Sequence, residues 1–125
     1  MSLLTTDVSS PLGTKIASES SASASTVNQI DDSAGTIYQI QVTNIGGGTD
    51  VYLKLWDATG STPTVGSDAP AFVLRCLAGA TVNVSIPGGI AYTTALWAAA
   101  VSASGGTAGT TSPTTTVRYS ILYTT

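Results

Sequence analysis

Hydrophobic and polar residues alternate with a period of two along much of the chain. Within residues 36–43, Tyr38, Ile40 and Val42 fall on one side of an extended backbone, and two glutamines fall on the other. A strand that buries only one face shows this alternation, because successive side chains point to opposite faces. The same pattern predicts strands over residues 36–43, 51–57, 71–77, 80–86 and 116–124.

Residues 95–101 break the alternation, because they are apolar throughout and rich in alanine. Alanine favours a helix, so two short helical turns are one interpretation of this run. The run is short, however, and threonine, serine and glycine flank it. We predict a central strand here, buried on both faces.

Segments rich in glycine, proline, asparagine and aspartate separate the predicted strands, and no amphipathic helical pattern lies between them. Such turn signals recur roughly every 8 to 15 residues, a spacing typical of antiparallel strands joined by tight connections. We therefore expect an all-β fold, an antiparallel β-sandwich or jelly roll of about 7 to 8 strands.

The first 26 residues have a different composition, because Ser18–Thr26 is dominated by serine. We divide the chain into an extended N-terminal arm, residues 1–26, and a β-sandwich domain, residues 27–125. The arm either packs on a partner, with Leu3, Leu4 and Val8 as apolar anchors, or forms an edge strand on its own domain.

Strand parity also predicts the core of the sandwich. Cys76 shares the inward parity of its strand, so we expect a small buried hydrophobe and not a reactive thiol. The inward residues predicted to pack together are Tyr38, Ile40, Val42, Leu53, Leu55, Val82, Val84 and Ile86.

Charge is scarce in this chain. Only 9% of the residues are charged, four basic against seven acidic, which gives a net charge of -3. Neutralising nucleic-acid phosphates requires clustered cations, so we expect no nucleic-acid partner. The longest apolar run is too short to span a bilayer and the first residues carry no basic leader, so we expect neither a membrane partner nor a signal peptide.

Few residues of the chain could form a catalytic or metal-binding site. The chain contains no histidine and one cysteine, which removes histidine-dependent triads and zinc sites of several Cys or His ligands. Most carboxylates fall in turns, where aspartate commonly caps the backbone. We expect no enzymatic activity and no cofactor; a loop calcium site joining Asp31 and Asp32 to Asp50 is the metal hypothesis left open.

The informative feature is the face of the strands opposite the core. Tyr52 and Trp56 have this outward parity, and so do Arg75 and Arg118. Aromatic residues and arginine are enriched in protein interfaces, and aromatic faces also bind sugars, so both interpretations apply; a third is that the arm covers this face. Because Val73 and Leu77 would add exposed apolar surface, we predict a homo-oligomer, a trimer before a dimer.

Several of these segments together resemble a known class of protein. They are residues 51–57, 63–66, 69–70, 72–75, 78–91 and 121–123. The chain resembles the small β-sandwich virion proteins of tailed bacteriophages, notably capsid decoration (cement) proteins. The resemblance implies a protein without enzymatic activity, made in the host cytoplasm, that binds the major capsid protein on the exterior of the virion. The alternatives are a receptor- or glycan-binding head of a tail fibre or spike, and a minor tail component.

Overall fold

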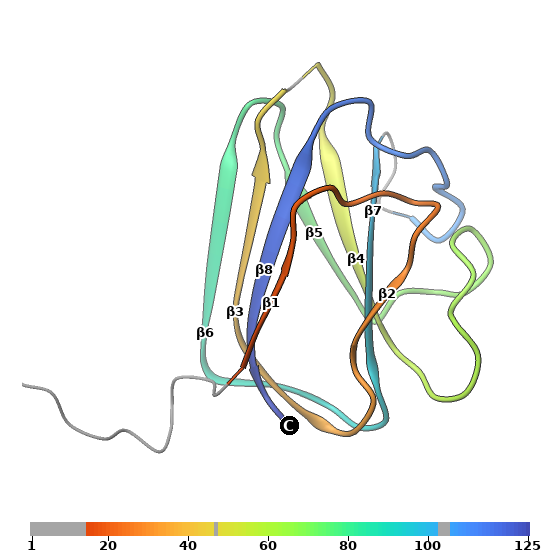
Figure 1. Ribbon diagram of the computed structural model, residues 1–125, viewed down its shortest axis with the longest axis vertical. Coiled ribbons are helices and arrows are strands. Elements are labelled where there is room, and N and C mark those ends of the chain that lie inside the picture. Colours follow the sequence, from red (N-terminus) through yellow and green to blue (C-terminus); the bar gives the residue numbers. More distant parts are fainter. Residues whose placement is uncertain (1–14, 47, 103–105) are drawn as a thin grey trace, which may run out of the picture.

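The computed structural model describes residues 15–46, 48–102 and 106–125, and this part of the chain folds into β-strands joined by turns and loops (Figure 1). It contains no helix there, and hence none long and apolar enough to cross a membrane. The strands are β1 (Lys15–Glu19), β2 (Asn28–Asp31), β3 (Gly35–Asn44), β4 (Val51–Asp57), β5 (Phe72–Cys76), β6 (Thr81–Tyr92), β7 (Leu96–Ser102) and β8 (Val117–Thr124).

The strands form two four-stranded sheets, with the orders β1-β8-β3-β6 and β2-β7-β4-β5. All neighbouring strands are antiparallel. Every connection passes from one sheet to the other except the one between β4 and β5. This strand order is that of a jelly roll, so the predicted all-β antiparallel sandwich is confirmed.

The core fills the space between the two sheets. Alternate residues of the two inner strands of each sheet are buried there, as expected where each sheet buries one face. The inner strands contribute Ile37, Ile40, Val42, Val51, Leu53, Leu55, Leu96, Ala98, Ala100, Val117, Tyr119, Ile121 and Tyr123. From the edge strands, Cys76 is fully buried, as predicted, while Val82 and Ile86 pack against the core but are only partly buried.

Tyr38 does not occupy the core position that its parity predicted. The register of β3 shifts between Ile37 and Gln39 against both of its neighbours. An extra residue in a strand reverses which side chains point inward on the two sides of the irregularity. Ile37 is therefore buried and Tyr38 is half-buried.

The alanine-rich run forms the strand that the sequence predicted. It is β7, it lies between β2 and β4, and all of its residues are buried. Small side chains suit this position, because β7 is covered by the core on one face and by loops on the other.

The described part of the arm, residues 15–26, packs on the sandwich itself. Residues Lys15–Glu19 form β1, which pairs with β8 from Lys15↔Tyr123 to Glu19↔Tyr119. Beyond β1, the Ala22 amide donates to the Val117 carbonyl at 2.9 Å, and the Ala22 side chain joins the core. For these residues the edge-strand interpretation applies. The predicted anchors Leu3, Leu4 and Val8 lie outside the residues that the structure describes.

A second apolar cluster lies on the outer face of β4 and β7. Trp56 and Trp97 are its centre, and the loop of residues 58–71 contributes Ala58 and Val65 to it. Both indole N–H groups donate to carbonyls of that loop, Trp56 to Asp68 at 3.0 Å and Trp97 to Ala58 at 2.9 Å. The prediction that Trp56 is an exposed interface residue was therefore wrong: its parity is outward, but this loop covers it and leaves it 2% exposed.

Candidate interaction surface

The structure separates the residues that the sequence grouped as one outer face. Tyr52 and Arg75 are directly paired on β4 and β5. Arg118 lies on β8, in the other sheet. With Trp56 covered, the predicted interface residues of the two sheets form two distinct surfaces.

The first surface lies on β5, and we define the β5 surface as Tyr52, Val73, Arg75 and Leu77. β5 ends the sheet order, so no strand among the described residues pairs with its outer backbone edge. Val73 is 43% exposed and Leu77 is 53% exposed, as their outward parity predicted. An edge strand with outward apolar side chains is a site for association with another chain.

Arg75 is held against its own sheet by Asp50, which no pattern in the sequence connects with it. The Nε of Arg75 donates to Oδ2 of Asp50 at 3.0 Å, and its Nη2 forms an ion pair with the same oxygen. Asp50 also accepts a bond from the Ala78 amide at 3.1 Å. The Arg75 hydrogen bond is the main cause of the lowered pKa of Asp50. Because the pair neutralises the cation, the apolar side chains dominate the β5 surface.

Strand parity predicts that Lys54, the outward neighbour of Leu53 on β4, is exposed, and this prediction is wrong. Lys54 is fully buried. Its Nζ donates to the carbonyls of Gly106 at 2.6 Å and Gly109 at 2.9 Å, and burial lowers its pKa. The segment after β7 thus covers Lys54 as the loop of residues 58–71 covers Trp56. No sequence pattern predicts that these two segments cover Lys54 and Trp56, because loop residues show no periodicity.

One buried and one half-buried aspartate accept hydrogen bonds from other parts of the chain. Asp57 accepts bonds from the amides and hydroxyls of Thr93 and Thr94, at 2.7–3.1 Å, and so closes the turn between β6 and β7. Desolvation alone would raise the pKa of Asp57, but these bonds lower it to about 2. Asp31 is 7% exposed and accepts a 2.5 Å bond from the Tyr92 hydroxyl. Its pKa is also lowered, because this bond and others outweigh the effect of burial.

The hypothesis of a calcium site from Asp31, Asp32 and Asp50 is not supported. Asp31 bonds to Tyr92 and Asp50 to Arg75. Over residues 15–46, 48–102 and 106–125, no three acidic, cysteine or histidine side chains come close enough together to hold a metal ion.

Comparison with known proteins adds no relative. No protein-family model matches the chain, and neither does any curated protein or any solved structure.

Proposed function

We propose that this chain is a structural virion protein, a decoration protein that binds the major capsid protein on the outside of a phage head and stabilises the shell. The observation that carries the proposal is the β5 surface. It presents exposed Val73 and Leu77 on a sheet edge with which no other strand of the described chain pairs.

The β5 surface supports an association function because β5 lacks the bulges and prolines that prevent an edge strand from pairing with another chain. β2 is bulged and β6 contains Pro87, whereas β5 is regular and contains no proline. Its charged residue, Arg75, is bound to Asp50 and so does not repel an approaching strand. We propose that copies of the chain associate here, as a trimer before a dimer.

The contact with the capsid protein is assigned to the arm. β1 is the edge strand of its sheet, and the chain preceding it carries the apolar residues Leu3, Leu4 and Val8. An oligomer brings several arms to a repetitive lattice, so weak individual contacts add up to high occupancy. Support for the virion setting comes from the sequence resemblance and, by analogy of fold only, from the occurrence of jelly rolls in viral capsids.

The test adds purified protein to particles assembled in its absence and measures the bound copies per capsid protein. We expect saturable binding to heads, with a stoichiometry set by the lattice. Val73→Asp disrupts the β5 surface, so we expect its occupancy at the same concentration to fall about tenfold through lost avidity. Ser85→Asp places the same charge at an exposed position of β6, in the other sheet and outside the arm, and serves as the matched control.

Two results would contradict the proposal. Binding confined to tails in electron micrographs of labelled particles would favour the tail-fibre or minor tail alternative. Equal occupancy of wild type and Val73→Asp on heads would show that the β5 surface contributes nothing to decoration.

A further inference from the structure

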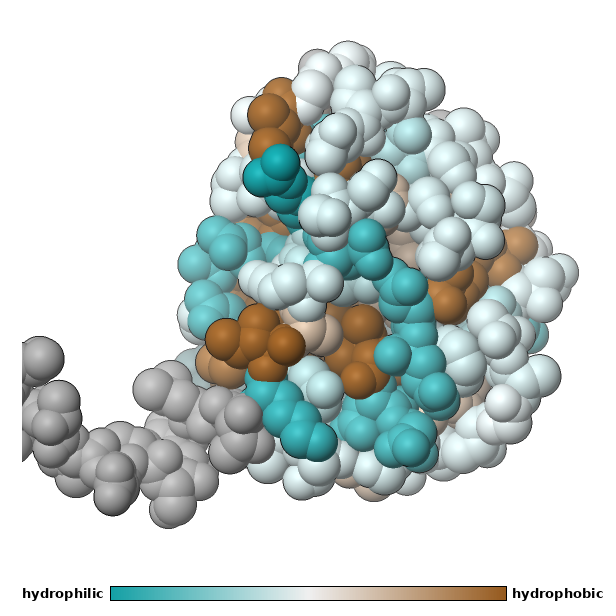
Figure 2. Space-filling view, viewed as in Figure 1, coloured by the Kyte–Doolittle hydropathy of each residue, from teal (hydrophilic) through white to brown (hydrophobic). Residues whose placement is uncertain are grey.

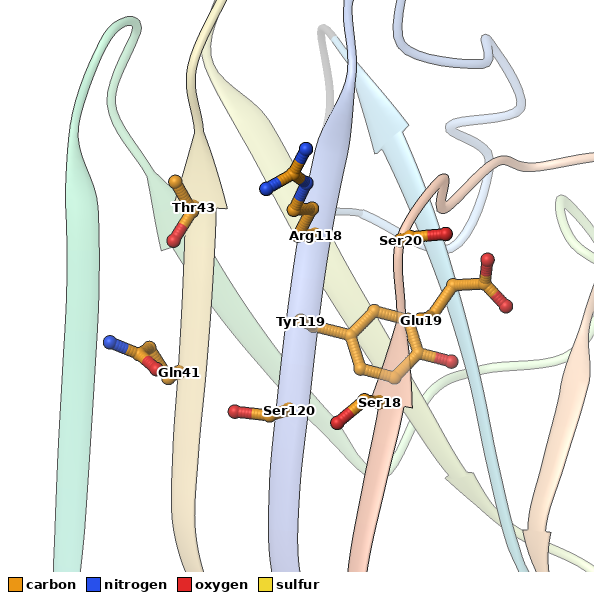
Figure 3. Close-up of a pocket in the computed structure, with 8 residues that line it drawn as sticks. All are labelled: Ser18, Glu19, Ser20, Gln41, Thr43, Arg118, Tyr119 and Ser120. Atoms are coloured by element: carbon orange, nitrogen blue, oxygen red, sulfur yellow. The ribbon is translucent and has the colours of Figure 1, made fainter.

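The outer face of the sheet β1-β8-β3-β6 contains a shallow groove of about 390 Å³ (Figure 3). It crosses three neighbouring strands, and polar side chains dominate its lining. The lining residues are Ser18, Glu19, Ser20, Gln41, Thr43, Arg118, Tyr119 and Ser120.

Arg118 provides the positive charge of this groove. It is exposed on β8, and no acidic residue of the described chain forms an ion pair with it. The nearby carboxylate of Glu19 is occupied elsewhere: it accepts bonds from the Ser21 amide at 3.0 Å and from Nδ2 of Asn28 at 2.9 Å. Figure 3 shows the Glu19 carboxylate directed away from Arg118. The guanidinium is thus available to an external anion.

The remaining lining offers neutral hydrogen-bonding groups. The side chains of Ser18, Ser120 and Gln41 form no hydrogen bond with any part of the chain that the structure describes, and in Figure 3 they lie below Arg118 on three adjacent strands. Adjacent strands are about 4.8 Å apart, so three strands present donors and acceptors over about 10 Å. That spacing matches the hydroxyl groups of one or two sugar rings.

We propose that this groove binds an acidic saccharide that carries one carboxylate among neutral hydroxyl groups. The planar guanidinium of Arg118 is suited to bidentate binding of the carboxylate. The serine hydroxyls and the Gln41 amide exchange hydrogen bonds with the ring hydroxyls. Next to the groove, and sharing Gln41 and Ser120 with it, a smaller hollow is bounded by Ile16 and Leu122. These aliphatic side chains contact the C–H face of a second ring.

The charge and polarity of the groove favour an acidic saccharide over a nucleic acid or a protein as its ligand. A nucleic acid requires several cations, and this chain has four in total and a net charge of -3. A protein contact requires a central apolar anchor, and the aromatic residue of the groove, Tyr119, is only 3% exposed. In Figure 2 most of this side of the molecule is close to neutral in hydropathy, strongly hydrophilic residues form a band across it, and hydrophobic residues form separate patches.

The test uses 3′-sialyllactose, which has one carboxylate, and lactose, its neutral counterpart. Titration of the isotopically labelled full chain, followed by amide NMR, should show saturable shifts around Ser18, Gln41 and Ser120 with sialyllactose. Galacturonic acid, which also carries one carboxylate among neutral hydroxyl groups, should produce shifts at the same residues. Lactose should bind at least about tenfold more weakly, because it lacks the charged partner of Arg118.

Variants identify the residue responsible. Arg118→Gln should weaken sialyllactose binding about tenfold or more, and Arg118→Lys should restore only part of it, because a lysine lacks the planar fork. Lys15→Gln removes the same charge from β1 outside the groove and should change the affinity less than twofold. Dispersed NMR spectra of each variant verify that it is folded.

Three outcomes would overturn the inference. They are the absence of shifts with both acidic sugars, equal affinity for lactose and sialyllactose, and an equal loss of affinity in Lys15→Gln and Arg118→Gln. If acetate at the same concentration caused the same shifts, the groove would be a simple anion site and not a saccharide site. If a saccharide bound elsewhere on the chain, the assignment to this groove would be wrong.

Discussion

Leu53 and Val73 lie on adjacent strands but on opposite faces of one sheet. Leu53 is fully buried between the sheets, whereas Val73 is 43% exposed. Leu53→Ala should therefore lower the free energy of unfolding by about 2–5 kcal/mol, because it leaves a cavity in the core. Val73→Ala should change it by less than about 0.5 kcal/mol. Urea denaturation of both variants tests this, and equal losses would mean that the faces of the sheet are assigned the wrong way round.

Asp57 determines part of the pH dependence of stability. Its pKa is about 2 in the folded chain against an ordinary 3.8, so the ionised carboxylate stabilises the fold above pH about 4. That stabilisation is lost as the pH falls from about 4 towards 2. At pH 7, Asp57→Asn should lower the free energy of unfolding by about 1–3 kcal/mol, because it loses charge-assisted hydrogen bonds.

Urea denaturation at several pH values measures both effects. The difference between wild type and Asp57→Asn should shrink below pH 4. The control is Asp32→Asn, at an exposed aspartate, which should change stability by less than about 0.5 kcal/mol at pH 7. A constant difference between wild type and Asp57→Asn from pH 7 to pH 2 would contradict the role given to this carboxylate.

At the scale of elements, β6 bends where it pairs with the bulge of β3. Gly88 and Gly89 have φ angles of +79° and +78°, so alanine is strained at either position. A Cβ on Gly89 would also lie 3.1 Å from the Ile37 carbonyl and even closer to Thr36, whereas a Cβ on Gly88 meets nothing within 4 Å. Gly89→Ala should thus lower the melting temperature more than Gly88→Ala. Equal shifts would mean that β3 moves freely away from this bend.

β1 connects the arm to the sandwich, so the position of a truncation matters. Removing residues 1–14 leaves β1 in place and should leave the stability unchanged within about 0.5 kcal/mol, while head occupancy falls. Removing residues 1–26 also removes β1 and the buried Ala22, and should cost about 2 kcal/mol or more. Calorimetry and particle binding of both truncations test this. Normal decoration by the shorter truncation would show that the arm does not contact the capsid.

At the scale of the whole molecule, the β5 surface predicts self-association. We expect the wild-type chain to sediment as a trimer at micromolar concentration, because association buries Val73 and Leu77. Val73→Asp should shift the chain to monomer, and Ser85→Asp should not. Sedimentation equilibrium measures all three masses. A monomeric wild type, or an oligomer unaffected by Val73→Asp, would contradict the role of this surface.

The sequence by itself determined six of the eight described strands, β3 to β8, and the buried parity of most of them, whereas β2 was not predicted. Alternation is a local property: where Phe72, Leu74 and Cys76 alternate with Val73 and Arg75, the chemistry of one strand identifies its inward face. The alanine-rich run was likewise identified as a buried strand. The polar Arg118 was assigned to the outer face for the same reason.

Only the tertiary structure decided which outward residues remain exposed. Trp56 and Lys54 have outward parity, but loops without periodicity fold back over them, and hydrogen bonds from their N–H groups to loop carbonyls satisfy the buried polar atoms. The bulge that turns Tyr38 outward depends on pairing with two neighbouring strands. The groove around Arg118 combines residues from β1, β3 and β8, because strands that are distant in sequence become neighbours only when the sheet closes.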